Sequence, residues 1–113
     1  MRETCLSDNF GNRAAPGAIN CDPVLGSGIE LAAAEAGADY EQTVVGGATY
    51  AITIPIDDGT WLFSLTGVTS TAANREWIAV EGTTIILHVP PGYTTLYYES
   101  DTIGSAHMRK LNI

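Results

Sequence analysis

Few residues of this chain are of a type that does chemistry, and those few lie apart in the sequence. His88 and His107 are the two histidines, and neither stands in a motif that supplies a catalytic partner or further metal ligands. Isolated histidines are more often structural or on the surface than functional, and we interpret both in that way. Asp57-Asp58-Gly59 lacks the alternating oxygen ligands and distal glutamate of an EF-hand loop, so it indicates a turn.

Motifs for nucleophilic catalysis and phosphate binding are absent from the sequence. No serine stands in G-x-S-x-G, and Gly46-Gly47 is not part of a loop that ends in Gly-Lys-Ser/Thr. The fold could bring two of the 13 acidic residues together, as glycoside hydrolysis requires, but the sequence singles out no pair. We therefore predict that the protein is not an enzyme and uses no cofactor or metal.

The two cysteines, Cys5 and Cys21, both lie near the N-terminus. Two thiols cannot complete a four-ligand zinc site, and no histidine lies near them in sequence. They could form one disulfide in an oxidising environment, whereas reduced thiols are expected in a cytoplasm. The sequence leaves both states open.

Composition and charge narrow the classes of partner. The chain has 113 residues, 45% of them hydrophobic, which suits one domain with one core. Acidic residues outnumber basic ones 13 to 5, giving a net charge of −8. Such a surface repels phosphate groups, so we expect no binding to nucleic acid or to anionic membranes. An acidic surface could dock on a basic protein, or it could serve solubility alone.

The N-terminal residues lack the basic and apolar regions of a secretory signal. No apolar run approaches the ~18–20 residues of a membrane-spanning helix. We therefore expect a protein made and used in a cytoplasm, or assembled there into something larger.

From Tyr40 onward, short runs of alternating apolar and polar residues are separated by turn residues, a pattern that predicts β-strands. The runs 48–56 and 60–66 flank Asp57-Asp58-Gly59, and we predict that they form an antiparallel hairpin with Gly59 at positive φ.

The second half of the chain repeats this design. Residues 83–89 and 94–99 flank Pro90-Pro91-Gly92, and we expect a hairpin-like pair because proline ends a strand. Further strands are expected over 77–80 and from Ser105 to Ile113. The sequence thus predicts an all-β fold, an antiparallel β-sandwich or jelly-roll-like barrel of about six to eight short strands, over residues 40–113.

Residues 1–39 differ in kind and predict an extended N-terminal arm. The segment 29–36 is rich in alanine and glutamate, which favours a short helix, but a strand or extended chain is an equal alternative. The arm could lie in a partner's grooves or wrap its own sandwich. Its isolated apolar anchors are Leu6, Phe10, Ile19, Val24 and Leu25.

Aromatic residues lie on or beside the expected strands. Alternation places Trp61 and Tyr98 in the core. Trp77 and Tyr97 could instead form an exposed aromatic surface that stacks on sugar rings, although core packing explains their spacing without a ligand. A carbohydrate-binding module is therefore the alternative to a purely structural protein.

The C-terminal third carries a resemblance to a family. Its residues include Val89-Pro90-Pro91-Gly92, Thr95-Leu96-Tyr97-Tyr98, Ser100-Asp101, Gly104-Ser105 and Met108-Arg109-Lys110-Leu111. This pattern resembles small virion proteins of tailed bacteriophages and is similar to capsid decoration (cement) proteins. The resemblance implies a β-rich structural protein on the capsid surface, often trimeric, that is assembled in the host cytoplasm. It also implies binding to the major capsid protein and to copies of itself, with a tail or fibre protein as the other virion alternative.

Overall fold

The computed structural model describes residues 22–112 of this chain. These residues form eight strands and one short 3₁₀ helix, η1 (Ala72–Asn74). The strands are β1 (Ile29–Ala33), β2 (Tyr40–Thr43), β3 (Thr49–Thr53), β4 (Thr60–Ser64), β5 (Trp77–Val80), β6 (Thr84–His88), β7 (Thr95–Ser100) and β8 (Gly104–Lys110). The prediction of an all-β fold of short strands is confirmed.

The strands form two antiparallel sheets of four, in the orders β1-β8-β3-β6 and β2-β7-β4-β5. Each strand of the first half pairs with one of the second half, β1 with β8, β2 with β7, β3 with β6 and β4 with β5. The chain is thus a long folded-over ribbon, rolled so that successive strand pairs alternate between the two sheets. This is the strand order of a jelly roll, one of the two architectures that the sequence predicts.

Both predicted hairpins are wrong. β3 and β4 flank Asp57-Asp58-Gly59 but belong to opposite sheets, and so do β6 and β7 on either side of Pro90-Pro91-Gly92. Pro55 and Pro90 stop the ladders because proline has no N–H to donate, and the chain then crosses between the sheets. Gly59 does take a positive φ of 69°, as predicted for a tight turn. The pairing of the two strands that flank this turn was the part predicted wrongly.

The segment Ile29–Ala33 is a strand, so the helix alternative for residues 29–36 is wrong. β1 pairs with β8 from Ile29–Met108 to Ala33–Gly104, and Leu31 and Ala33 are buried. An isolated helix this short is marginal in water, whereas the strand buries an alternating apolar face. β1 therefore belongs to the sandwich, although the sequence assigns residues 1–39 to an arm.

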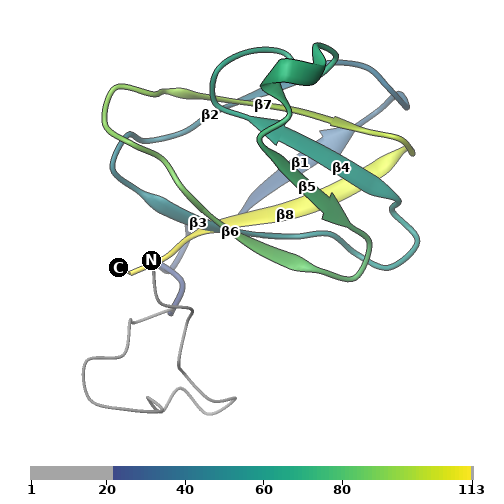
Figure 1. Cartoon of the computed structure of the whole chain (residues 1–113). Coiled ribbons are helices and arrows are strands. Elements are labelled where there is room, and N and C mark those ends of the chain that lie inside the picture. The colour runs from purple at the N-terminus through teal and green to yellow at the C-terminus, as the bar shows by residue number, and fades with distance from the viewer. Residues whose placement is uncertain (1–21, 113) are drawn as a thin grey trace.

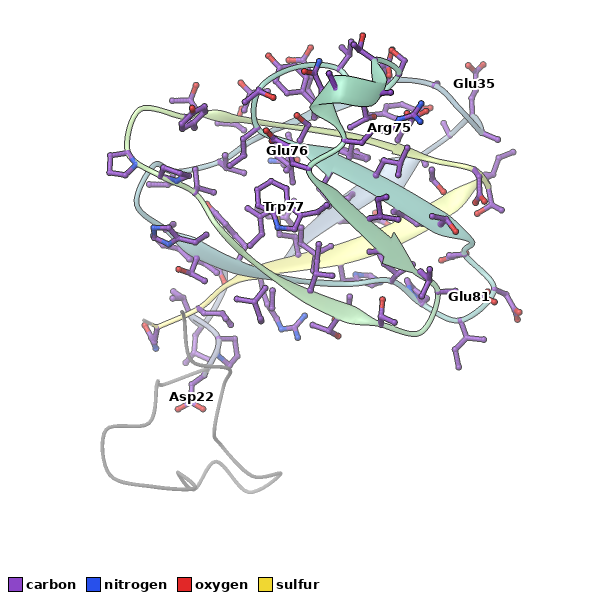
Figure 2. All side chains as sticks on the ribbon, viewed as in Figure 1. Asp22, Glu35, Arg75, Glu76, Trp77 and Glu81 are labelled. Atoms are coloured by element: carbon purple, nitrogen blue, oxygen red, sulfur yellow. The ribbon has the colours of Figure 1, made fainter. Side chains whose placement is uncertain are left out.

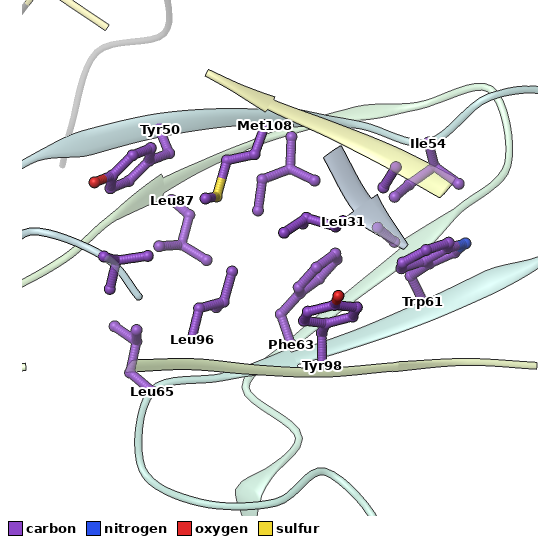
Figure 3. Packing of buried hydrophobic residues seen from close by; sticks show 14 of the residues in the cluster. Leu31, Tyr50, Ile54, Trp61, Phe63, Leu65, Leu87, Leu96, Tyr98 and Met108 are labelled. Carbon is purple, nitrogen blue, oxygen red and sulfur yellow. The ribbon is translucent and has the colours of Figure 1, made fainter. Parts of the chain in front are cut away.

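The core lies between the inner faces of the two sheets (Figure 3). Trp61, Phe63 and Tyr98 form an aromatic cluster, with Trp61–Tyr98 and Trp61–Phe63 centroids 5.9 and 6.3 Å apart. Aliphatic side chains from both sheets fill the remaining space: Leu31, Ile52, Ile54, Leu65, Leu87, Val89, Leu96 and Met108. The placement of Trp61 and Tyr98 in the core is as alternation predicts.

One end of the sandwich gathers the turns that follow β1, β3, β5 and β7 (Figure 1). We call it the acidic end, and its acids are Glu35, Asp39, Asp57, Asp58, Glu81 and Asp101. Side-chain carboxylates tie its turns together, since Glu81 Oε2 accepts from the Asp57 N–H at 2.6 Å and Asp101 Oδ1 from the Thr60 N–H at 2.8 Å.

The other end holds the turns after β2 and β6 and the residues that leave β4 and enter β5. We call it the hollow end, because a surface hollow opens there. Here the turn at Gly46-Gly47 lies against Pro91 and Gly92, and the Gly47 N–H donates to the Val89 carbonyl at 2.6 Å. β8 also finishes at this end, with Arg109 and Lys110. The two ends therefore differ in charge before any site is considered.

Candidate functional site

A surface hollow of about 300 Å³ opens at the hollow end. It lies between the start of β5 and the end of β6, each of which is an edge strand of its sheet. Its lining residues are Leu65, Thr66, Glu76, Trp77, His88, Pro90 and Tyr93. Small-molecule sites begin at about this volume and combine apolar walls with a few polar groups, as this lining does.

Trp77 forms one wall of the hollow. It opens β5 opposite Phe63, and residues directly opposite on antiparallel strands share a face, so its side chain lies on the inner side of its sheet. Because β5 is an edge strand, the ring packs on the core and still borders the hollow. Figure 2 shows Trp77 between the start of β5 and the segment that leaves β6, with Glu76 beside it.

Glu76 is fixed in place by its neighbours. Its Oε1 accepts from the Leu65 N–H at 2.7 Å and from the Ser64 hydroxyl at 3.3 Å, and its Oε2 accepts from the Thr66 hydroxyl at 3.1 Å. These bonds hold the residues that leave β4 against those that enter β5. The carboxylate therefore borders the hollow with little freedom to move, and it retains lone pairs for further donors.

Several polar groups around the hollow have no hydrogen bond to the part of the chain that the structure describes. The indole N–H of Trp77 and the hydroxyl of Tyr93 are two of them. His88 Nδ1 lies 2.9 Å from the Thr49 hydroxyl, which leaves its Nε2 without a partner in residues 22–112. The hollow thus presents donors and acceptors that the fold does not use.

The acidic end carries a second distinctive surface. Large aliphatic side chains stand exposed among its acids: Ile56 is 76% exposed, Ile103 70% and Val80 51%. Ile56 lies over the β5–β6 turn, close to Gly82, and its neighbour Asp57 bonds to Glu81 of that turn. Apolar anchors within a charged rim are the usual anatomy of a protein-binding surface.

The predicted aromatic surface of Trp77 and Tyr97 does not form. Tyr97 alternates with the buried Leu96 and Tyr98 on β7, so it points out of the sandwich, whereas Trp77 lies on the inner face of the same sheet. The structure instead brings Trp77 together with Tyr93 and His88. Sequence reasoning missed this grouping because Tyr93 lies in the β6–β7 connection, outside any alternating run.

Most of the predicted arm anchors lie outside the described residues. Leu6, Phe10 and Ile19 are among these, as are Cys5 and Cys21, so the disulfide stays a prediction. Val24 is half-buried, and its N–H donates to the Lys110 carbonyl at 2.8 Å, which ties this part of the chain to β8. Leu25, by contrast, is 93% exposed.

Within residues 22–112, no group of three or more His, Cys, Asp and Glu side chains is placed to hold a metal ion. Over the same range, no helix is long and apolar enough to cross a membrane. His107 is exposed on the outer face of β8, with Glu30 opposite it on β1.

No protein-family model matches this chain, and comparison with curated proteins and with solved structures finds no significant match to either.

Proposed function

We propose that this chain is a structural protein of a bacteriophage virion, a capsid decoration protein that binds the major capsid protein and stabilises the particle. The observation that carries the proposal is the jelly-roll strand order, an architecture used by viral capsid domains. This is an argument by analogy of fold, and it joins the resemblance of the last third of the chain to phage virion proteins.

The acidic end supplies the surface for docking. It offers Ile56, Val80 and Ile103 as exposed apolar anchors among the carboxylates of its turns. The matching partner surface is apolar at its centre and basic around it, because opposite charges steer association and exclude wrong partners. A decoration protein is present in many symmetric copies, so a modest contact repeated over the lattice gives tight attachment.

The N-terminal arm supplies a second contact in this proposal. Its anchors Leu6, Phe10, Ile19, Val24 and Leu25 would lie on neighbouring capsid subunits or on copies of this chain in a trimer. The arm test must spare the sandwich, because deleting residues 1–39 would also remove β1 with its buried Leu31 and Ala33. A deletion of residues 1–21 leaves every described strand intact.

The test uses heads assembled from the major capsid protein encoded in the same genome, prepared without this chain. The purified protein is added back, and its co-sedimentation and the melting temperature of the particles are measured. We expect saturable binding, weaker at high salt because the acidic rim contributes, and particles that melt at a higher temperature. Failure both to bind and to stabilise the heads would refute the proposal.

A matched pair of variants locates the contact. Ile103→Ser removes an exposed anchor at the acidic end, and Ile86→Ser removes an exposed isoleucine from the outer face of β6. We expect Ile103→Ser to weaken head binding by about tenfold or more, because a few apolar anchors carry most of an interface's affinity. Ile86→Ser should bind as the wild type does. Equal effects would mean that the acidic end is not the docking surface.

A further inference from the structure

We propose that the hollow bordered by Trp77 and Tyr93 is a binding site for a neutral saccharide. The site lies at the opposite end of the sandwich from the acidic end, so it does not overlap the docking surface proposed there. It also differs from the outward aromatic surface that the sequence predicts, since Tyr97 takes no part in it.

The walls of the hollow suit the apolar face of a sugar ring. Trp77 and Tyr93 contribute aromatic rings, while Pro90 and Leu65 add aliphatic surface. Trp77 packs against the core on one side, and Tyr93 is 40% exposed. A fixed aromatic ring loses little conformational entropy when a ligand stacks on it, and the C–H groups of a pyranose present an apolar face to such a ring.

The polar groups match a ligand rich in hydroxyls. The Trp77 indole N–H is a donor only, the Glu76 carboxylate is an acceptor only, and the Tyr93 hydroxyl is both. A hydroxyl of a sugar donates and accepts at once, so one ring can satisfy all three groups. A proline-rich peptide also docks on aromatic grooves, but its proline residues have no N–H to donate to the Glu76 carboxylate.

Charge selects a neutral saccharide over an acidic one. The lining contains one carboxylate, Glu76, and neither lysine nor arginine. Arg75, next in sequence, directs its guanidinium elsewhere, with Nε donating to the Thr69 carbonyl at 2.8 Å. An anionic sugar would therefore meet a fixed negative charge without a cation to balance it. The same charge argues against phosphorylated ligands.

The experiment measures binding of the purified full chain to an array of neutral and acidic oligosaccharides and to a proline-rich peptide. Hits are followed by NMR chemical-shift mapping. We expect a subset of neutral saccharides to bind and to shift the Trp77 indole and Tyr93 signals. Absence of any saccharide binding, preference for acidic sugars, peptide binding alone, or shifts centred on Tyr97 would each overturn the proposal.

Variants then test the residues. Tyr93 lies in the β6–β7 connection, outside the strands. Tyr93→Ala is expected to weaken saccharide binding by about tenfold or more. Trp77→Phe keeps the packing on the core but removes the indole N–H, and it should also weaken binding. Tyr97→Ala is the matched control and should leave affinity unchanged. Normal affinity in both Tyr93→Ala and Trp77→Phe would refute the site, and a folded spectrum of each variant makes that result decisive.

Discussion

The two tryptophans of this chain lie on the same face of one sheet, but they differ in burial and in hydrogen bonding. Trp61 on β4 and Trp77 on β5 both lie on the inner face of the sheet. Trp61 is fully buried near the acidic end, beside Phe63 and Tyr98, and its indole N–H donates to the Asp58 carbonyl at 2.7 Å. Trp77 is partly exposed at the hollow end, and its N–H has no partner in the described residues.

This difference shows how one pattern yields a core residue and a site residue. β4 has a neighbouring strand on each side, and its first residue, Thr60, is hydrogen-bonded to Asp101 of the β7–β8 turn. Both the ring and the indole N–H of Trp61 therefore have partners within the fold. β5 is an edge strand, and its start borders the hollow near Pro90 and Tyr93 of the β6–β7 connection. The unused face and N–H of Trp77 are what remain for a ligand. The comparison is tested by changing matched residues at the two ends.

The largest expected difference is between the tryptophans themselves. Trp61→Ala removes a fully buried ring and should lower the free energy of unfolding by about 3–5 kcal/mol. Trp77→Ala removes a partly exposed ring, and we expect a loss of about 1–2 kcal/mol. Urea denaturation followed by circular dichroism measures both. Equal losses would mean that Trp77 is a core residue, which would also weaken its assignment to a ligand site.

Two glycines extend the comparison to the backbone. Gly59 at the acidic end has φ 69° and Gly47 at the hollow end has φ 87°, so alanine is strained at both. At Gly59 the added Cβ also meets the Asp101 carboxylate, whereas at Gly47 it meets no atom within 4 Å.

We expect Gly47→Ala to cost about 1 kcal/mol, the strain of a left-handed residue, in chemical denaturation. Gly59→Ala should cost about 2–3 kcal/mol, since Asp101 must also release the Thr60 N–H. If the two variants unfold at the same urea concentration, the acidic turns are looser than the hydrogen bonds between them imply.

The sequence predicted the core better than the pairing. Alternation placed Trp61, Phe63 and Leu65 on one buried face, because burial of every second residue is a local property of a strand. It did not predict that β3 and β4 lie in opposite sheets. A turn such as Asp57-Asp58-Gly59 fits a hairpin or a crossing, and only long-range contacts between the two halves of the ribbon decide which forms.

Because local pattern does not determine strand pairing, the sequence also could not predict the candidate site. Trp77 opens β5 and Tyr93 follows β6, so nearly two strands and the turn between them separate the two residues. Their meeting depends on which strands lie at the sheet edges. Ile29–Ala33 shows the reverse case, where a helix-favouring composition lost to burial against β8. Local propensity is too weak to outweigh an apolar face that the sandwich can bury.

The smallest expected effect concerns Tyr98, which packs beside Trp61 and stacks on Tyr40 with ring centroids 5.6 Å apart. Burial raises the pKa of Tyr98 above its ordinary value, and the neighbouring Tyr40 adds to the rise. The neutral phenol donates to the Ala32 carbonyl at 2.9 Å, joining β7 of one sheet to β1 of the other. Its contribution to stability is thus present below about pH 10 and is lost as the pH rises through the folded-state pKa.

Tyr98→Phe removes this dependence together with the hydrogen bond. At neutral pH we expect the variant to be less stable by about 0.5–1.5 kcal/mol. Above about pH 10 the wild type should lose stability more steeply than the variant, so the two unfolding free energies converge. Urea titrations between neutral and alkaline pH measure the convergence. A constant difference across that range would show that the hydroxyl of Tyr98 ionises as freely in the folded chain as in the unfolded one, contrary to its burial in the core.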